Sequence, residues 1–180
     1  MTRSVSCGEA LISLLESYEV DTVFGIPGVH TLDLYRGLAH SNIRHVQARN
    51  EQGAGFMAAG YARASGGVGV AIVTSGPGAT NCVTPVRDCM ADSVPIVVIC
   101  GQVPRAAIGT DAFQEADITG ATMPVTKHNY LVMRADDLGR TVHEAFHIAR
   151  TGRPGPVLID IPKDVFIEMG EYDPDEPIDL

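Results

Sequence analysis

The sequence of 180 residues lacks tryptophan, is poor in aromatic residues (6%), and has no apolar run near the length of about 18 residues that spans a membrane. The amino terminus shows no apolar stretch of signal-peptide length. The four cysteines show no C-x-x-C spacing, and Cys82 and Cys100 lie in or beside apolar runs, where free thiols are common core residues. With 45% hydrophobic and 19% charged residues, the composition excludes a disordered, collagenous or coiled-coil chain. We therefore expect a reduced, cytoplasmic globular protein with no membrane partner.

Basic residues are also scarce, with 13 Lys and Arg against 22 Asp and Glu, which gives a net charge of −9. This excess of acid argues against nucleic acid or an anionic membrane as a partner. The stretch 168–180 alone has six acidic residues and no base, so the remaining residues carry −9 less −6, or −3. We predict one domain over residues 1–165, followed by an acidic linker or tail over residues 166–180.

Short β-branched and apolar segments alternate with helical segments along the chain. Several apolar runs are continuous, which is typical of parallel strands buried on both faces. The predicted strands are Thr22–Gly25, Arg44–Ala48, Val68–Ser75, Pro95–Gly101, Asn129–Met133 and Gly155–Ile161. A first helix follows the capping box Ser6–Glu9, and further helices are predicted at Leu32–Leu38, Glu51–Ala64, Thr80–Met90 and Asp136–Ala149. This alternation predicts an α/β fold with a doubly wound, mainly parallel six-stranded sheet and helices on both faces, and the pattern stops after Pro162.

In an open parallel sheet, ligands bind outside the carboxyl ends of the strands, and Glu51 lies at such an end. The helix that it opens is otherwise small and apolar. A glutamate in a first turn can simply complement the helix dipole. Alternatively, the small residues let a flat ligand or another backbone approach closely, and a desolvated carboxylate with a raised pKa can then exchange a proton.

The glycine-rich segment Ser75–Asn81 joins a buried strand to a helix. It is either an ordinary strand-to-helix turn or a backbone-lined seat for a ligand at a helix amino terminus. It matches neither a Walker A loop nor a dinucleotide-binding fingerprint. The polar loop Gly109–Asp117 follows another strand, where functional loops concentrate, although a plain surface connection also explains it.

The segment His143–His147 matches H-E-x-x-H on a predicted helix, which taken alone is a zinc-protease signature. Both histidines fall on the side of the helix opposite its apolar arc, and no later histidine supplies a third ligand. We therefore predict solvated helix histidines and no metal site in this chain.

Taken together and in order, these segments resemble the thiamine-diphosphate enzymes of the acetolactate synthase group, over about residues 5–165. The resemblance rests on the stretches Val23–Gly28, Asn50–Ala54, Thr74–Asn81, Gly101–Val103, Ile108–Glu115, Thr126–His128, Gly152–Val157 and Asp160–Asp164. It identifies the chain with the amino-terminal, pyrimidine-binding domain of such enzymes. In the family, Mg²⁺ is held by a later diphosphate-binding domain through a Gly-Asp-Gly motif, which this sequence does not contain.

The resemblance implies roles for individual residues. Glu51 matches the glutamate that hydrogen-bonds the aminopyrimidine ring of the cofactor and favours its imino tautomer, which makes Glu51 the expected catalytic residue. Phe113 and Lys127 match positions on the substrate side, and Arg153 matches an arginine that touches FAD in flavin-containing members. Other positions that match cofactor-binding residues are Ile26, Pro27, Gly28, Thr74, Pro77, Asn81 and Gln114.

The implied activity is decarboxylation of a 2-oxo acid, pyruvate, and transfer of the aldehyde unit to a second 2-oxo acid. The implied partner is a second copy or a chain carrying the diphosphate-binding domain, and the apolar helix after Glu51 also favours self-association. The sequence departs from the synthase group at Ile26–His30, where Tyr-Pro-Gly-Gly is usual, and at Asn50, where histidine is usual. Alternative functions are therefore another thiamine-diphosphate-dependent 2-oxo-acid decarboxylase, or a non-catalytic subunit of a split enzyme.

Overall fold

A six-stranded sheet, in which every pair of neighbouring strands is parallel, forms the centre of the computed structural model, which describes residues 3–172. The strands lie in the order β3-β2-β4-β5-β7-β6. Their bounds are β2 (Thr22–Gly25), β3 (Arg44–Gln47), β4 (Gly69–Val73), β5 (Ile96–Gln102), β6 (His128–Leu131) and β7 (Val157–Pro162). The chain leaves β2 toward one edge and returns at β4 on the other side, so the switch point of the sheet lies between β2 and β4.

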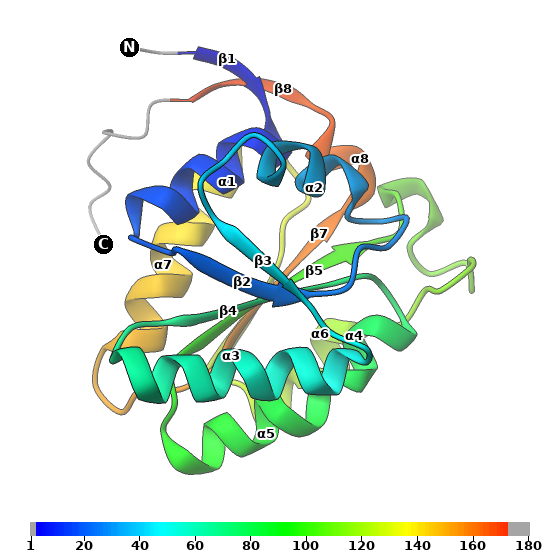
Figure 1. Cartoon of the computed structure of the whole chain (residues 1–180). Helices are drawn as coiled ribbons and strands as arrows, with labels where there is room; N and C mark the ends of the chain where they lie inside the picture. The colour runs from blue at the N-terminus through cyan, green and yellow to red at the C-terminus, as the bar shows by residue number, and fades with distance from the viewer. Residues whose placement is uncertain (1–2, 173–180) are drawn as a thin grey trace.

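Helices cover both faces of the sheet, as predicted (Figure 1). One face carries α1 (Cys7–Ser17), α2 (Leu32–Leu38), α7 (Leu138–Arg150) and α8 (Lys163–Phe166). The other carries α3 (Glu51–Ser65), α4 (Pro77–Asn81), α5 (Val83–Asp92) and α6 (Ile118–Thr122). Short 3-10 turns are η1 (Arg105–Ala107), η2 (Met123–Val125) and η3 (Ala135–Asp137). The predicted doubly wound α/β fold is confirmed.

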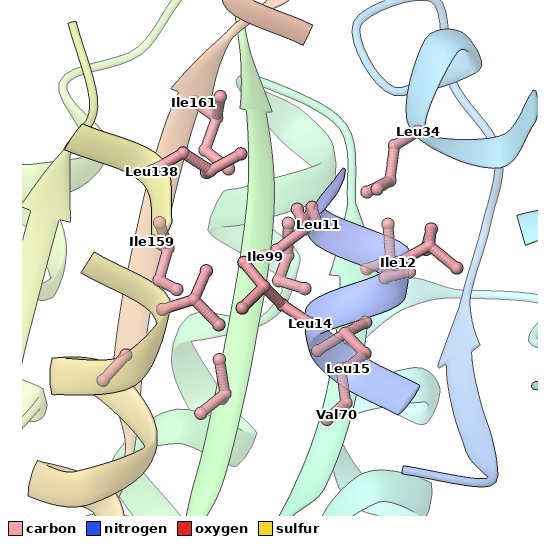
Figure 2. Close-up of a cluster of buried hydrophobic side chains, with 14 of the residues drawn as sticks. Leu11, Ile12, Leu14, Leu15, Leu34, Val70, Ile99, Leu138, Ile159 and Ile161 are labelled. Atoms are coloured by element: carbon pink, nitrogen blue, oxygen red, sulfur yellow. The ribbon is translucent and has the colours of Figure 1, made fainter. Parts of the chain in front are cut away.

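Large aliphatic side chains fill the core between the sheet and the helices α1 and α7 (Figure 2). The predicted capping box opens α1: Glu9 N donates to Ser6 Oγ (3.3 Å), and Ser6 N donates to the Glu9 carboxylate (3.0 Å). The helix then buries Leu11, Leu14 and Leu15 completely. Each buried leucine contributes about 1.5–3 kcal/mol to stability, so this face holds α1 firmly against the strands.

Small residues form the core on the opposite face, where α3 lies very close to the sheet. A Cβ atom added to Gly69 of β4 would lie 2.1 Å from the carbonyl oxygen of Ala58 in α3. One added to Gly55 would lie 2.4 Å from Pro85 of α5. These contacts explain why the buried side of α3 is built from glycine and alanine: larger side chains there would push the helix away from β4 and α5.

Two features of the secondary structure correct the sequence prediction. The helix predicted over Thr80–Met90 is two helices, α4 and α5, that meet at Cys82. The reason is Pro85, whose ring would clash with the carbonyl of the residue four positions earlier in a continuous helix.

The regular pattern also does not stop at Pro162. After α8, β8 (Met169–Tyr172) pairs antiparallel with β1 (Arg3–Ser6), which the sequence analysis did not predict. Of the predicted tail, residues 173–180 lie outside the described residues. Among residues 3–172, the structure holds no helix that is both long and apolar enough to cross a membrane.

Candidate functional site

The turns that follow β2 and β4 meet at the switch point of the sheet. A Cβ atom added to Gly28 would lie 2.4 Å from Thr74 Cβ, so only glycine permits this contact between the two turns. His30, from the same turn as Gly28, is buried, and its Nδ1 lies 3.2 Å from Thr74 Oγ1. Burial lowers the pKa of His30, which favours the neutral imidazole. The turn after β2 therefore forms one wall of a site at the carboxyl ends of the strands.

Glu51 and Asn81 form a direct pair at the same edge. Asn50 caps α3, because Gln52 N donates to its Oδ1 (2.8 Å), and this start places Glu51 as the first residue of the helix. The Nδ2 group of Asn81, at the end of α4, donates to Glu51 Oε2 (2.9 Å). Cys82 Sγ donates to the backbone carbonyl of Glu51 (3.2 Å). The carboxylate is thus held from the α4 side and is only half-buried.

Glycine keeps the space between this carboxylate and the turn after β4 narrow. A Cβ atom added to Gly78 would lie 2.8 Å from Thr74 Cγ2 and 3.6 Å from Glu51 Oε1. Thr74 therefore lies between the turn that contains Gly28 and the start of α4, where Gly78 in turn lies beside Glu51 of α3. The structure brings together the predicted cofactor-side residues Gly28, Glu51, Thr74 and Asn81.

The loop between β5 and α6 folds back onto the glycine-rich turn. Gly76 has φ +57°, and a Cβ atom added to it would lie 2.2 Å from the carbonyl oxygen of Gln114. Gln114 itself has φ +60°. Glu115 holds the loop closed, accepting from the backbone N–H groups of Thr110 (3.2 Å) and Ala112 (3.0 Å) and also of Gly109. The predicted residue Gln114 therefore lies beside the site, and its neighbour Phe113 is 77% exposed.

Lys127 and Arg153 lie at the opposite edge of the sheet, because each precedes the strand it leads into. Lys127 Nζ donates to the carbonyls of Thr151 (2.8 Å) and Ile148, at the end of α7. Arg153 donates to Ser93 Oγ (2.8 Å) and to the carbonyls of Met90 (3.1 Å) and Ala91 (2.8 Å), at the end of α5. The structure thus does not bring these two cations together with Glu51 in one chain, and their predicted ligand contacts stay predictions.

A buried polar chain behind the glycine-rich turn was missed by the sequence analysis. Ser75 Oγ donates to Gln102 Oε1 (2.7 Å), and Gln102 Nε2 donates to Asp160 Oδ2 (2.8 Å). All three residues are buried, and Asp160 is only 1% exposed. The signal was present in the sequence: Asp160 is a charged residue inside the otherwise apolar run Val157–Ile161.

Of the two histidines of the H-E-x-x-H segment, both predicted to be solvated, His147 agrees with the prediction and His143 departs from it. His143 is half-buried: its Nδ1 lies 2.6 Å from Tyr18 Oη, and the Tyr18 ring stacks on Phe146 at 4.3 Å between centroids. His147 is exposed. Within residues 3–172 there is no group of three or more His, Cys, Asp or Glu side chains placed to hold a metal ion.

The sequence is similar to those of known proteins. The chain is 60% identical over 164 residues to the acetolactate synthase large subunit of Mycobacterium tuberculosis, covering 91% of this chain and 26% of that protein. It is 59% identical over 158 residues to the acetolactate synthase large subunit of Corynebacterium glutamicum (87% and 25%), and 52% identical over 173 residues to the chloroplastic acetolactate synthase 3 of Brassica napus (96% and 26%). The chain therefore spans about a quarter of the length of these relatives. Residues 5–121 match the model of the thiamine pyrophosphate enzyme N-terminal TPP-binding domain, and the chain belongs to that family.

Proposed function

We propose that this chain is the pyrimidine-binding part of an acetolactate synthase-like enzyme. Such an enzyme decarboxylates a 2-oxo acid, pyruvate, and transfers the aldehyde unit to a second 2-oxo acid. The observation that carries the proposal is the Glu51 carboxylate, held by Asn81 at the switch point of a sheet that belongs to the thiamine pyrophosphate enzyme family. The names of the relatives support the choice of reaction.

The residues at the site fit a flat, nitrogen-containing ring. Glu51 keeps acceptor capacity beyond the bond from Asn81, so it can accept from or share a proton with a ring nitrogen. The absence of side chains at Gly28 and Gly78 lets both turns pack closely against Thr74, which brings their backbone to the same edge of the sheet as Glu51. When bound, thiamine diphosphate supplies an electron sink for the loss of CO₂ from a 2-oxo acid.

The other residues bind and orient. Asn81 fixes the side chain of Glu51, so that the carboxylate is directed before any ligand arrives. The turn that contains Ile26 and Pro27 and the turn that begins α4 at Pro77 would line the ring from two sides. Gln114 would close the third side, and the exposed ring of Phe113 is available to exclude water from the substrate.

The partner is proposed to be a second copy of this domain or a chain that carries the diphosphate-binding domain with its Mg²⁺. One side of α3 has no neighbour among residues 3–172: Phe56 is 43% exposed, and a Cβ atom added to Gly53 or Gly60 would meet none of these residues within 4 Å. This surface lies next to Glu51 and carries small and apolar residues, so it suits close packing against another protein. FAD belongs to the proposal only through Arg153, which would have to contact it from the opposite edge of the sheet.

A second candidate is another thiamine-diphosphate-dependent 2-oxo-acid decarboxylase. The observation that favours it is His30, which occupies a buried position against Thr74 in the turn where the synthase group has a different sequence. A non-catalytic subunit of a split enzyme is the third candidate.

The four free cysteines are all buried, which supports a reducing compartment such as the cytoplasm.

The test is a chimera that joins this chain to the remaining domains of the Mycobacterium tuberculosis relative, assayed for acetolactate formation from pyruvate with thiamine diphosphate and Mg²⁺. We expect activity in the chimera, none in the 180-residue chain alone, and a loss of about 100-fold or more in kcat for Glu51→Gln. Glu9→Gln is the matched control, because it makes the same change in the first turn of α1.

Two results would contradict the proposal. One is a folded chimera that forms no acetolactate, and the other is a Glu51→Gln chimera as active as its parent. Carbon dioxide release without acetolactate would support the decarboxylase alternative.

A further inference from the structure

We propose that Gln102 is a positioning residue whose buried amide fixes the glycine-rich turn 74–78 and the loop 103–117 relative to each other, with Asp160 setting the orientation of that amide. That Gln102 holds the two segments in place is inferred from its hydrogen bonds alone. Its consequence for the cofactor rests on the proposed function.

The Gln102 amide contacts all the elements that meet behind the site. Its Oε1 accepts from Ser75 Oγ (2.7 Å), in the turn after β4, and from Val103 N (2.9 Å), at the start of the loop. Its Nε2 donates to Ala116 O (3.2 Å), near the end of the same loop, and to Asp160 Oδ2 (2.8 Å) in β7. One side chain, 4% exposed, thus joins the turn to both ends of the loop.

The two segments that Gln102 joins are also in close contact at the site itself. Gly76 of the turn leaves no room for a Cβ atom next to the carbonyl of Gln114. Because the contact is backbone against backbone, a small displacement of the loop relative to the turn would either break it or close the space beside it. The position of Gln114 and of the exposed Phe113 therefore depends on what holds the loop ends.

Asp160 decides which way the amide points. An ionised carboxylate only accepts hydrogen bonds, so Nε2 must face β7, and Oε1 then faces the two donors, Ser75 and Val103 N–H. The opposite orientation would place Oε1 against two acceptors, Asp160 Oδ2 and Ala116 O. Asp160 is inside the sheet, and its hydrogen bond from Gln102 is the contact through which we propose that it acts on the site.

Substitutions separate the two functions of the amide. In Gln102→Glu an oxygen replaces Nε2 and faces Asp160 and Ala116 O, so both donor contacts are lost. In the double variant Gln102→Glu/Asp160→Asn, the new amide of residue 160 can donate to the new carboxylate, which restores the link to β7. Ser75→Ala is milder, because it removes only the link to the turn. Val97→Ala is the matched control, because it loses buried volume in β5 on the opposite face of the sheet.

The first measurement uses the 180-residue chain and follows amide hydrogen exchange by mass spectrometry. We expect Gln102→Glu to speed exchange about tenfold or more in residues 103–117 relative to Val97→Ala. Ser75→Ala should speed exchange in residues 74–78 without the same effect on the loop, and the double variant should recover part of the loss. If exchange in both segments is the same in Gln102→Glu as in the control, the positioning inference is wrong. If Gln102→Glu does not fold, Ser75→Ala takes its place in the comparison with Val97→Ala, and exchange in residues 74–78 that is no faster than in the control would contradict the inference.

The second measurement uses the chimera described above. We expect Gln102→Glu to raise the concentration of thiamine diphosphate at half-saturation about tenfold, with a smaller change in kcat at saturating cofactor, and the double variant to reverse part of this. An equal change in Val97→Ala would reduce Gln102 to a purely structural residue and overturn the inference. If the unsubstituted chimera forms no acetolactate, the proposed function fails, while hydrogen exchange still decides whether Gln102 positions the two segments.

Discussion

Replacing Asp160 with asparagine should stabilise the chain at neutral pH, although the residue lies in the centre of the fold. The side chain is 1% exposed, and its Oδ1 atom has no hydrogen-bond partner among the residues that the structure describes. Burial raises the pKa of Asp160 to about 6, against the opposing effect of the hydrogen bond from Gln102. Asp117 adds a smaller repulsion in the same direction as burial. The ionised form is therefore unfavourable in the folded chain.

The size and sign of the effect follow from proton linkage. Because the folded pKa is about 6 and the ordinary value is 3.8, the folded chain binds the proton more tightly than the unfolded chain. Stability is greatest below the ordinary value and falls as the pH rises through about 6. The raised pKa of Asp160 lowers the free energy of unfolding by about 3 kcal/mol at pH 7.5 and by about half of that at pH 5. Asparagine keeps an acceptor for Gln102 and carries no charge, so it should recover most of this energy.

The assay is urea unfolding of the 180-residue chain, followed by circular dichroism at pH 5.0, 6.0 and 7.5. We expect Asp160→Asn to unfold at higher urea than the unsubstituted chain, with a gain that grows with pH toward about 3 kcal/mol. Asp136→Asn is the control, because that carboxylate is exposed and forms a surface ion pair with Arg134, and it should change stability by less than about 0.5 kcal/mol. A destabilised Asp160→Asn, or a gain of equal size at all three pH values, would refute the reasoning.

Two further predictions concern local backbone structure in the same chain. Gly76→Ala should destabilise the fold by about 2 kcal/mol or more, because the position has φ +57° and a new methyl would strike the carbonyl of Gln114, whereas Gly60→Ala, in an open helical position, should stabilise it by up to about 1 kcal/mol. Urea midpoints compare the two, and equal midpoints would mean that the turn after β4 is not built as described. Ser6→Ala should lower the thermal midpoint by the equivalent of about 1 kcal/mol through loss of the capping box, and Ser6→Thr should not; equal losses in both would exclude capping as the cause.

The sheet was predictable because its central strands are buried on both faces. Runs such as Val68–Ser75 and Pro95–Gly101 are apolar at successive positions, a pattern that a strand with one wet face does not show. The small sheet of β1 and β8 was not predictable in this way. Each strand has four residues, and their stability comes from pairing between two segments more than 160 residues apart, which no local pattern reveals.

The part of the site that contains Glu51 and Asn81 was predictable, because both residues belong to sequence motifs and both follow strands of the parallel sheet. Glu51 and Asn81 come from different elements, and only the common carboxyl edge of parallel strands brings them into contact. Gln102 and Asp160 were missed because their role is a hydrogen-bond geometry between β5, β7 and a loop. A buried aspartate in an apolar run is a signal that such geometry exists, but it does not name the partner.

The positions of Lys127 and Arg153 constrain how any complete site can be assembled. The helices run opposite to the strands, so their carbonyl ends gather at the amino edge of the sheet, where both cations are hydrogen-bonded to carbonyls. Glu51 lies at the other edge, so one small ligand cannot touch all three residues of a single chain. If the cations and Glu51 contact one small ligand, at least one of the contacts comes from a second protein surface. We therefore propose that another copy or another domain contributes to the site in which those roles are combined.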